Sequence, residues 1–218
     1  MNSSSGRKDM LQLIDEAAGN YSRYEIFSDF VKASALAMSN ACTVIQDKVW
    51  LDREQEWQAI ANKHGDKVMH KFSMMLAILA LELEQNMSDV LGQVYMEAEM
   101  GSKQTGQFFT PFHISKLVAQ IAMKHVERGE KYVINEPSCG GGGMIIATAV
   151  ALRDAGIDYQ RVMDVYAQDL DWKSVYMCYL QLSLLGIRAT CMQGDTLSGG
   201  VIDKAHRFDT PRKAGVLI

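Results

Sequence analysis

The chain has 218 residues, of which 48% are hydrophobic, and its 22 basic and 26 acidic residues give a formal net charge of −4. This composition allows a sizeable core in one or two domains, and the charge excludes a protein held to nucleic acid by net charge alone. Residues 1–9 are polar and contain no apolar signal segment, and the longest apolar run, residues 74–81, is too short to cross a bilayer. We therefore expect a cytoplasmic protein without a membrane partner.

The first half of the chain is predicted to be helical. Residues 1–20 are interpreted as a flexible N-terminus and residues 21–105 as an all-helical domain. Ser22 opens the first helix with capping-box spacing, Gly65 is a left-handed stop, and Ser88 is the expected cap of the last helix. Apolar periodicity places these helices at about residues 23–45, 53–64, 68–85 and 89–101.

The second half alternates helices and strands. The predicted strands are residues 131–135, 161–168 and 187–193, and the predicted helices are residues 110–126, 143–155 and 171–185. This alternation predicts an α/β fold with a doubly wound parallel sheet, whose ligands bind beyond the carboxyl ends of the strands. Glu136, Asp169 and Asp195 all fall at those ends, so we expect them to share one site.

The most distinctive segment is the run of four glycines, Gly140 to Gly143, between the first strand and its helix. Glycines without Cβ atoms allow a ligand to lie directly against the backbone. The N–H groups that open the next helix present donors and a partial positive charge. The pattern is typical of a cofactor cradle, although glycine-rich turns also occur as simple connectors.

Four motifs in this order resemble those of adenine-specific (N6) DNA methyltransferases, in particular the modification subunits of type I restriction-modification systems. They are G-Q-F-F-T-P at 106–111, E-P-S-C-G-G-G-G at 136–143, Q-D-L-D at 168–171 and G-D-T-L at 194–197. The resemblance covers about residues 20–200. It implies a Rossmann-like, S-adenosylmethionine (SAM)-dependent methyltransferase fold with a partial parallel sheet at residues 106–198, behind the helical domain. Residues 199–218 would be a tail with a stub of a fourth strand at 215–218.

The resemblance also implies which residues bind SAM. Residues 107–111 would hold its methionine end, the glycines would admit the methionine moiety and ribose, Asp169 would accept hydrogen bonds from the ribose hydroxyls, and Asp195 from the adenine amine. The implied set is Gln107, Phe108, Phe109, Thr110, Pro111, Glu136, Pro137, Gly140, Gly141, Gly142, Gly143, Asp169, Leu170, Asp195 and Thr196. The family more often has aspartate at position 136, serine at 141 and glutamate at 169. No metal ligand is expected, because the four cysteines lack metal-site spacing.

Simpler roles remain open for several of these residues. Asp169 or Asp171 could cap the following helix, and Asp195 could form an Asx turn. Phe108 and Phe109 could pack under a loop, and Cys139 is expected to be a small buried filler rather than a nucleophile.

One motif of the family is missing. Adenine methyltransferases of this kind carry Asn or Asp, two prolines and then Tyr or Phe, which hold and stack the flipped base. The three prolines here are Pro111, Pro137 and Pro211, and none is paired with another. The nearest substitute is the segment at residues 208–211, in which Asp209 would take the catalytic role.

Three functions follow as hypotheses. The first is a SAM-dependent DNA adenine-N6 methyltransferase, or its cofactor-binding portion, acting on DNA in a restriction-modification system with a protein partner or as a homo-oligomer. The second is a catalytically silent relative that binds SAM or DNA as an accessory or regulatory protein. The third is an NAD-dependent oxidoreductase, which is disfavoured because Ile145 stands where G-x-G-x-x-G requires its third glycine. We also expect the free edge of the first strand to be covered by the C-terminal tail or by a second chain.

Overall fold

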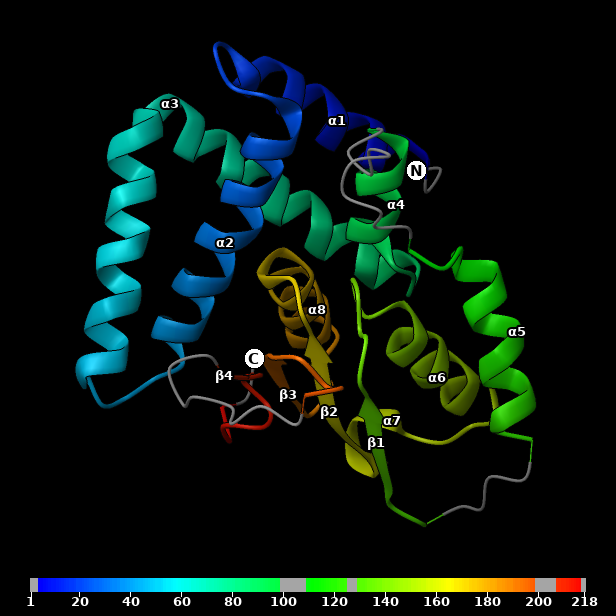
Figure 1. Ribbon diagram of the computed structural model, residues 1–218. Coiled ribbons are helices and arrows are strands. Elements are labelled where there is room, and N and C mark those ends of the chain that lie inside the picture. The colour runs from blue at the N-terminus through cyan, green and yellow to red at the C-terminus, as the bar shows by residue number, and fades with distance from the viewer. Residues whose placement is uncertain (1–3, 99–108, 125–128, 199–206, 217–218) are drawn as a thin grey trace.

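The computed structural model describes residues 4–98, 109–124, 129–198 and 207–216. Its N-terminal half consists of α1 (Ser4–Ala18), α2 (Arg23–Ala41), α3 (Lys48–Gln85) and α4 (Val90–Glu97). The second half consists of α5 (Phe112–Ala122), β1 (Tyr132–Glu136), α6 (Gly143–Asp154), α7 (Tyr159–Val162), β2 (Met163–Asp169), α8 (Trp172–Leu184), β3 (Ala189–Gln193) and β4 (Arg207–Asp209) (Figure 1). Among these helices, none combines the length and apolarity that a membrane span requires.

The sheet has the strand order β1-β2-β3-β4. The first three strands are parallel and β4 is antiparallel to β3. In the register of the sheet Glu136 is opposite Ala167, and Asp169 is opposite Gln193. The carboxyl ends of the parallel strands therefore lie along one edge. This confirms the predicted α/β fold with a partial parallel sheet behind a helical region.

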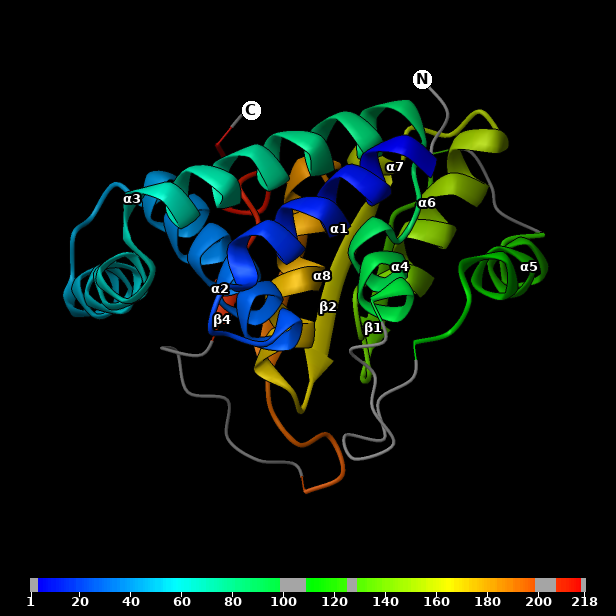
Figure 2. The same cartoon turned by 90° about the horizontal axis from the view of Figure 1, so that it is seen from above.

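Helix α8 is the centre of the molecule. It packs against β2 and β3 on one side and against α2 on the other, so it joins the sheet to the N-terminal helices (Figures 1 and 2). A helix in this position is apolar on most sides because it is buried all round. Its fully buried side chains include Val175, Met177, Tyr179, Leu180 and Leu182.

The N-terminus differs from the sequence interpretation. Residues 1–20 were expected to be flexible, but Ser4–Ala18 form α1. Met10, Leu13, Ile14 and Ala17 recur at helical spacing and are buried against the neighbouring helices. This apolar stripe stabilises α1, although the polar residues at the start of the chain did not predict a helix.

Several helix boundaries differ from the predicted ones, and at two helix starts the reason is an aspartate cap. Helix α3 begins at Lys48, earlier than expected, because the Asp47 side chain accepts a hydrogen bond from the Trp50 N–H at 3.0 Å. The predicted stop at Gly65 is confirmed as a break with φ of +71° inside α3. The cap of α4 is Asp89 and not Ser88, since the Asp89 carboxylate accepts from the Gly92 N–H at 2.9 Å.

The fourth strand lies elsewhere than expected. Arg207–Asp209 form β4 on the outer edge of β3. Of the expected stub at 215–218, residues 215 and 216 are not in a strand, and residues 217–218 lie outside the described residues. The Phe208 side chain is buried against the rings of Trp172, Tyr176 and Tyr179, which hold β4 at that edge. The described part of the tail thus covers β3 and not β1. Within the described ranges, the outer edge of β1 has no strand beside it.

Candidate functional site

Three loops meet where the parallel strands end. The Cys139 N–H, after β1, donates to the Gln168 carbonyl at 2.8 Å, and the Gly194 N–H, after β3, donates to the Asp169 carbonyl at 3.0 Å. The Thr196 hydroxyl, after β3, donates to the Pro137 carbonyl, after β1, at 2.9 Å. The segments after β1, β2 and β3 are therefore joined to one another at a single edge of the sheet.

Asp169 is the link between β2 and the glycine turn. One of its carboxylate oxygens accepts from the Gly140 N–H at 2.8 Å, and the other accepts from the Asp171 N–H at 3.0 Å. The N-cap of α8 is Asp171 and not Asp169, so the capping role that was open for both applies to Asp171 only. Each carboxylate oxygen can accept one more hydrogen bond, so Asp169 can hold the turn and still receive a ligand.

Glu136 adds a second carboxylate at this edge. It is the last residue of β1, it is partly buried, and it accepts from the Ser138 N–H at 3.3 Å. Burial raises the pKa of Glu136, and the nearby carboxylate of Asp169 raises it further. Two acidic groups in one partly buried place favour a ligand that carries positive charge.

The space that side chains at Gly140 and Gly142 would occupy is already filled by other residues. Gly140 and Gly142 have φ of +51° and +92°, which only glycine adopts readily. A Cβ atom on Gly140 would lie 2.9 Å from the ring of Phe109, and one on Gly142 would lie 3.2 Å from the Cys178 sulfur. A ligand therefore has to approach the turn from outside these contacts, along the edge where the strands end.

The segment before α5 lies against this turn. Phe109 packs between Gly140 and the ring of Tyr95, whose centroid is 5.2 Å from its own. Pro111, and not Thr110, occupies the N-cap position of α5, and Thr110 is exposed. Phe109 thus has the predicted packing role and also lies next to the candidate site. Gln107 and Phe108 lie outside the described residues.

Two exposed leucines flank the carboxylates. Leu170 follows Asp169 and is 68% exposed, and Leu197 lies two residues after Asp195 and is 97% exposed. Asp195 accepts from the Leu197 N–H at 2.9 Å, which is the predicted Asx turn. Isolated apolar side chains beside acceptors form a surface suited to a flat ring with donor groups at its edge.

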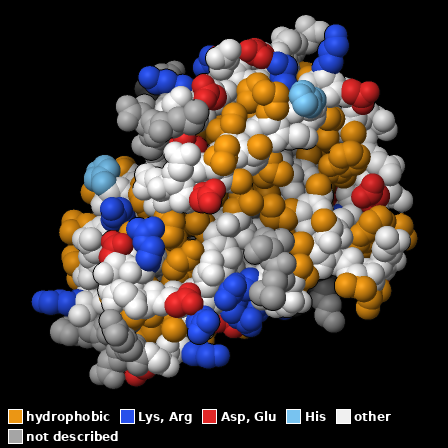
Figure 3. Space-filling model, turned by 180° about the vertical axis from the view of Figure 1, so that it is seen from behind, with side chains coloured by type: hydrophobic (Ala, Val, Ile, Leu, Met, Phe, Trp, Pro, Cys, Tyr) orange, Lys and Arg blue, Asp and Glu red, His pale blue; other side chains and the backbone are white. Residues whose placement is uncertain are grey.

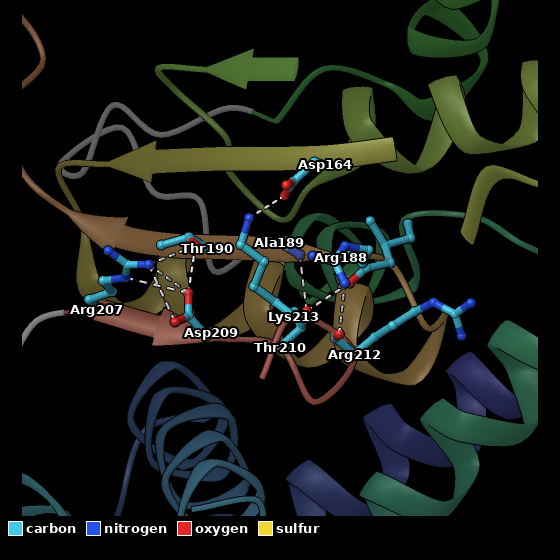
Figure 4. Close-up of polar contacts among 10 residues, drawn as sticks. Asp164, Arg188, Ala189, Thr190, Arg207, Asp209, Thr210, Arg212 and Lys213 are labelled. Atoms are coloured by element: carbon cyan, nitrogen blue, oxygen red, sulfur yellow. Dashed lines mark hydrogen bonds and ion pairs between the residues drawn. The ribbon is translucent and has the colours of Figure 1, made fainter. Parts of the chain in front are cut away.

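Asp209 lies at the other side of the sheet. It lies in β4, opposite Thr190 of β3. Strand β4 is three strand spacings, roughly 14 Å, from β1. The Asp209 carboxylate accepts from the Thr190 hydroxyl at 2.5 Å and pairs with Arg207 at 3.3 Å (Figure 4). It also lines a cavity of 590 Å³ between β4 and the loop that joins α2 to α3. The structure does not bring Asp209 to the glycine turn.

Sequence reasoning missed two residues that lie under the glycine turn, Asp89 and Gln181. The Gln181 side-chain amide donates to the Gly141 carbonyl at 2.7 Å and to Asp89 at 2.8 Å. The only signal in the sequence was an aspartate three residues before a glycine at a helix start, and it does not indicate a contact with a distant turn.

A parallel sheet with a glycine turn after its first strand and a carboxylate after its second defines a Rossmann-like nucleotide-cofactor fold. The sequence profile of the N-6 DNA Methylase family matches residues 86–210, which is more than half of the chain and includes all of these features. The chain belongs to this family, as the resemblance of its motifs predicted.

Three individual proteins are similar to parts of the chain. The chain is 28% identical over 114 residues to the Type I restriction enzyme MpnII methylase subunit of Mycoplasma pneumoniae (strain ATCC 29342 / M129 / Subtype 1), a match that spans 49% of this chain and 20% of that protein. A putative class I S-adenosylmethionine-dependent methyltransferase from Listeria monocytogenes is 13% identical, with a TM-score of 0.48 over 84% of this chain and 51% of that one. The type I restriction-modification methyltransferase subunit from Streptococcus thermophilus is 14% identical, with a TM-score of 0.40 over 86% and 57%.

Proposed function

We propose that this chain binds S-adenosylmethionine as the cofactor-binding portion of a DNA adenine-N6 methyltransferase. One observation carries the proposal. In a chain of the N-6 DNA Methylase family, the Asp169 carboxylate is hydrogen-bonded to the glycine turn at the edge where three parallel strands end. That arrangement puts a ribose acceptor and a side-chain-free backbone within reach of one ligand.

The residues present fit the chemistry of this cofactor. Asp169 retains acceptor capacity for two ribose hydroxyls, and Asp195, with the exposed Leu170 and Leu197, suits an adenine ring and its amine. The acidic pair of Glu136 and Asp169 suits a sulfonium cation. Phe109 lies beside the turn, where residues 109–111 would cover the methionine end.

The chain's own contribution to methyl transfer would be positioning. SAM supplies an electrophilic methyl group on a sulfonium centre. The carboxylates and the turn hold that molecule in one orientation, which is the main requirement of a direct displacement. The groups that orient the target amine in this family are absent from all 218 residues, since no two prolines are adjacent. The role of Asp209 as their substitute stays a prediction.

Calorimetry tests the cofactor. Titration with SAM should give saturable heat, and titration with NAD should give none; the reverse result would contradict the proposal. Transfer of a tritiated methyl group to unmodified DNA then separates a methyltransferase from a silent SAM-binding relative. If Asp209→Ala abolishes transfer with unchanged SAM affinity, Asp209 is catalytic, whereas unaltered transfer excludes that role.

We also propose that α5 pairs with a second copy of the chain. Its aliphatic residues recur at i, i+3, i+4 and i+7 but face outward, while Ser115 and Ala119 face inward. The exposed residues are Ile114, Leu117, Val118 and Ile121. Figure 3 shows hydrophobic side chains next to Lys or Arg at the edge where α5 lies. Such a stripe is unusual on a monomer's surface.

The stripe is complementary to itself. In an antiparallel pair related by a two-fold axis, Ile114 meets Ile121 of the second copy and Leu117 meets Val118, and neither Lys116 nor Lys124 faces another lysine. Light scattering should therefore give a dimer, and Leu117→Lys with Ile121→Lys should give a monomer. Leu81→Lys, at a 55% exposed leucine of α3, is the matched control and should leave the dimer intact. A monomeric wild type would exclude this pairing.

A further inference from the structure

A buried polar cluster connects the N-terminal helices to the glycine turn. Asp89, the cap of α4, and Gln181, from the middle of α8, are both almost fully buried. The Gln181 amide nitrogen donates to an Asp89 oxygen at 2.8 Å and to the Gly141 carbonyl at 2.7 Å, and its oxygen accepts from the Leu91 N–H at 3.1 Å. Both donors and the acceptor of this amide are satisfied, so only one of its two orientations fits.

The glycines of the turn make room for the Asp89 carboxylate. A Cβ atom on Gly141 would lie 2.7 Å from one Asp89 oxygen, and a Cβ atom on Gly143 would lie 3.1 Å from the other. Gly141 does not have a left-handed backbone, so its backbone conformation would accept alanine. The approach of Asp89 is therefore the specific reason for glycine at position 141.

The turn is held from both ends by side chains of different elements. Asp169 of β2 fixes the Gly140 N–H, and Gln181 of α8 fixes the Gly141 carbonyl. The two contacts act on the peptide groups before Gly140 and after Gly141. The Gly142 N–H also donates to the Cys139 carbonyl at 2.8 Å. Removing either side-chain contact leaves this backbone hydrogen bond as the remaining restraint on a turn of four glycines, so the turn should become less rigid.

We propose that Asp89 and Gln181 are positioning residues for cofactor binding, which fix the orientation of the glycine turn from beneath. The inference rests on the proposed function, in which the backbone of the glycine turn contacts the cofactor. It follows that Asp89, from the helical half of the chain, affects the affinity for SAM without contacting the cofactor.

A purely structural role for Asp89 would give a different result. Loss of a helix cap lowers stability, and Asp47 offers the same change at a distant cap, where it receives the Trp50 N–H. Asp89→Ala and Asp47→Ala should thus both lower the melting temperature, and Asp89→Ala by more, because Asp89 is buried and also accepts from Gln181. Only the change at Asp89 should weaken SAM binding, by about tenfold, because it alone releases the turn.

Two further variants keep the test independent of folding. Gln181→Met retains the volume of the side chain and removes its hydrogen bonds, and should weaken SAM binding by about tenfold. Asp89→Asn retains the acceptor oxygen and should stay within about twofold of the wild type. Equal SAM affinity in all four variants would overturn the inference.

A compensating pair provides the sharpest test. Gly141→Ala alone should weaken SAM binding by about tenfold or more, because its methyl group meets the Asp89 carboxylate. In the Asp89→Ala background the same substitution should add no more than about twofold, because the opposing oxygens are gone. If Gly141→Ala weakens SAM binding by as large a factor in the Asp89→Ala background as it does in the wild type, the cofactor itself requires glycine at 141, and the inference is wrong.

Hydrogen exchange separates this inference from the proposed function. If the wild type does not bind SAM, the proposed function fails, and the amides of residues 139–144 still report on the turn. Their exchange should accelerate in Asp89→Ala and Gln181→Met but not in Asp47→Ala. Equal exchange in the three variants would overturn the positioning role, whether or not SAM binds.

Discussion

Replacement of Asp169 by alanine is the most direct test of the candidate site. The carboxylate makes two hydrogen bonds to backbone N–H groups, at 2.8 Å to Gly140 and at 3.0 Å to Asp171, and would also receive the ribose hydroxyls. A hydrogen bond to a charged group contributes about 1.5–3 kcal/mol. Loss of the ribose contact should therefore weaken SAM binding roughly 10- to 150-fold.

The assay is calorimetric titration of SAM into the folded variant. Asp158→Ala is the matched control, because Asp158 accepts from the N–H two residues later, as Asp169 does, but lies before the amino end of β2. The control should lose similar stability and keep its affinity for SAM. If Asp169→Ala binds SAM as tightly as the wild type does, Asp169 only fixes the turn, and the proposed ribose contact is refuted.

Three other changes have defined outcomes. Because the pKa of Glu136 is raised in the folded protein, the free energy of unfolding should fall as the pH rises above the ordinary pKa of 4.5. In urea titrations, Glu136→Gln should therefore be more stable than the wild type at pH 7. This difference should vanish below pH 4.5. Leu170→Ala should weaken SAM binding by about 1 kcal/mol, or fivefold, in calorimetry if the leucine covers the adenine ring. Gly140→Ala should lower the melting temperature more than Gly129→Ala does, since both have positive φ but only Gly140 faces the Phe109 ring.

The edge of the sheet that carries the site was predictable from the sequence. Each of Glu136, Asp169 and Asp195 follows a short apolar run, and each run is preceded by a helix and a glycine stop. Strand type and direction follow from such local patterns, because parallel strands joined by helices put their carboxyl ends together. The helix caps at Ser22 and Asp171 are local in the same sense, since cap and acceptor are neighbours in the chain.

The surroundings of the turn were not predictable in this way. The glycines suggested an open space for a ligand, whereas Phe109, Cys178 and Asp89 fill the space beside them. Asp89 and Gln181 are 92 residues apart, and no periodicity links them. Their pairing results from the packing of α4 against α8, which depends on the shapes of both helices together.

Local residue patterns by themselves determined the alternation of α5, β1, α6, β2, α8 and β3, the membership in the N-6 DNA Methylase family and the residues at the strand ends. The tertiary structure decided that β4 joins β3 and not β1, that Asp209 stays away from the turn, and that the aliphatic side of α5 faces outward. The physical reason is the range of the interactions. Propensities, caps and turns act between neighbours along the chain, whereas strand pairing and burial depend on surfaces that exist only after distant segments have packed together.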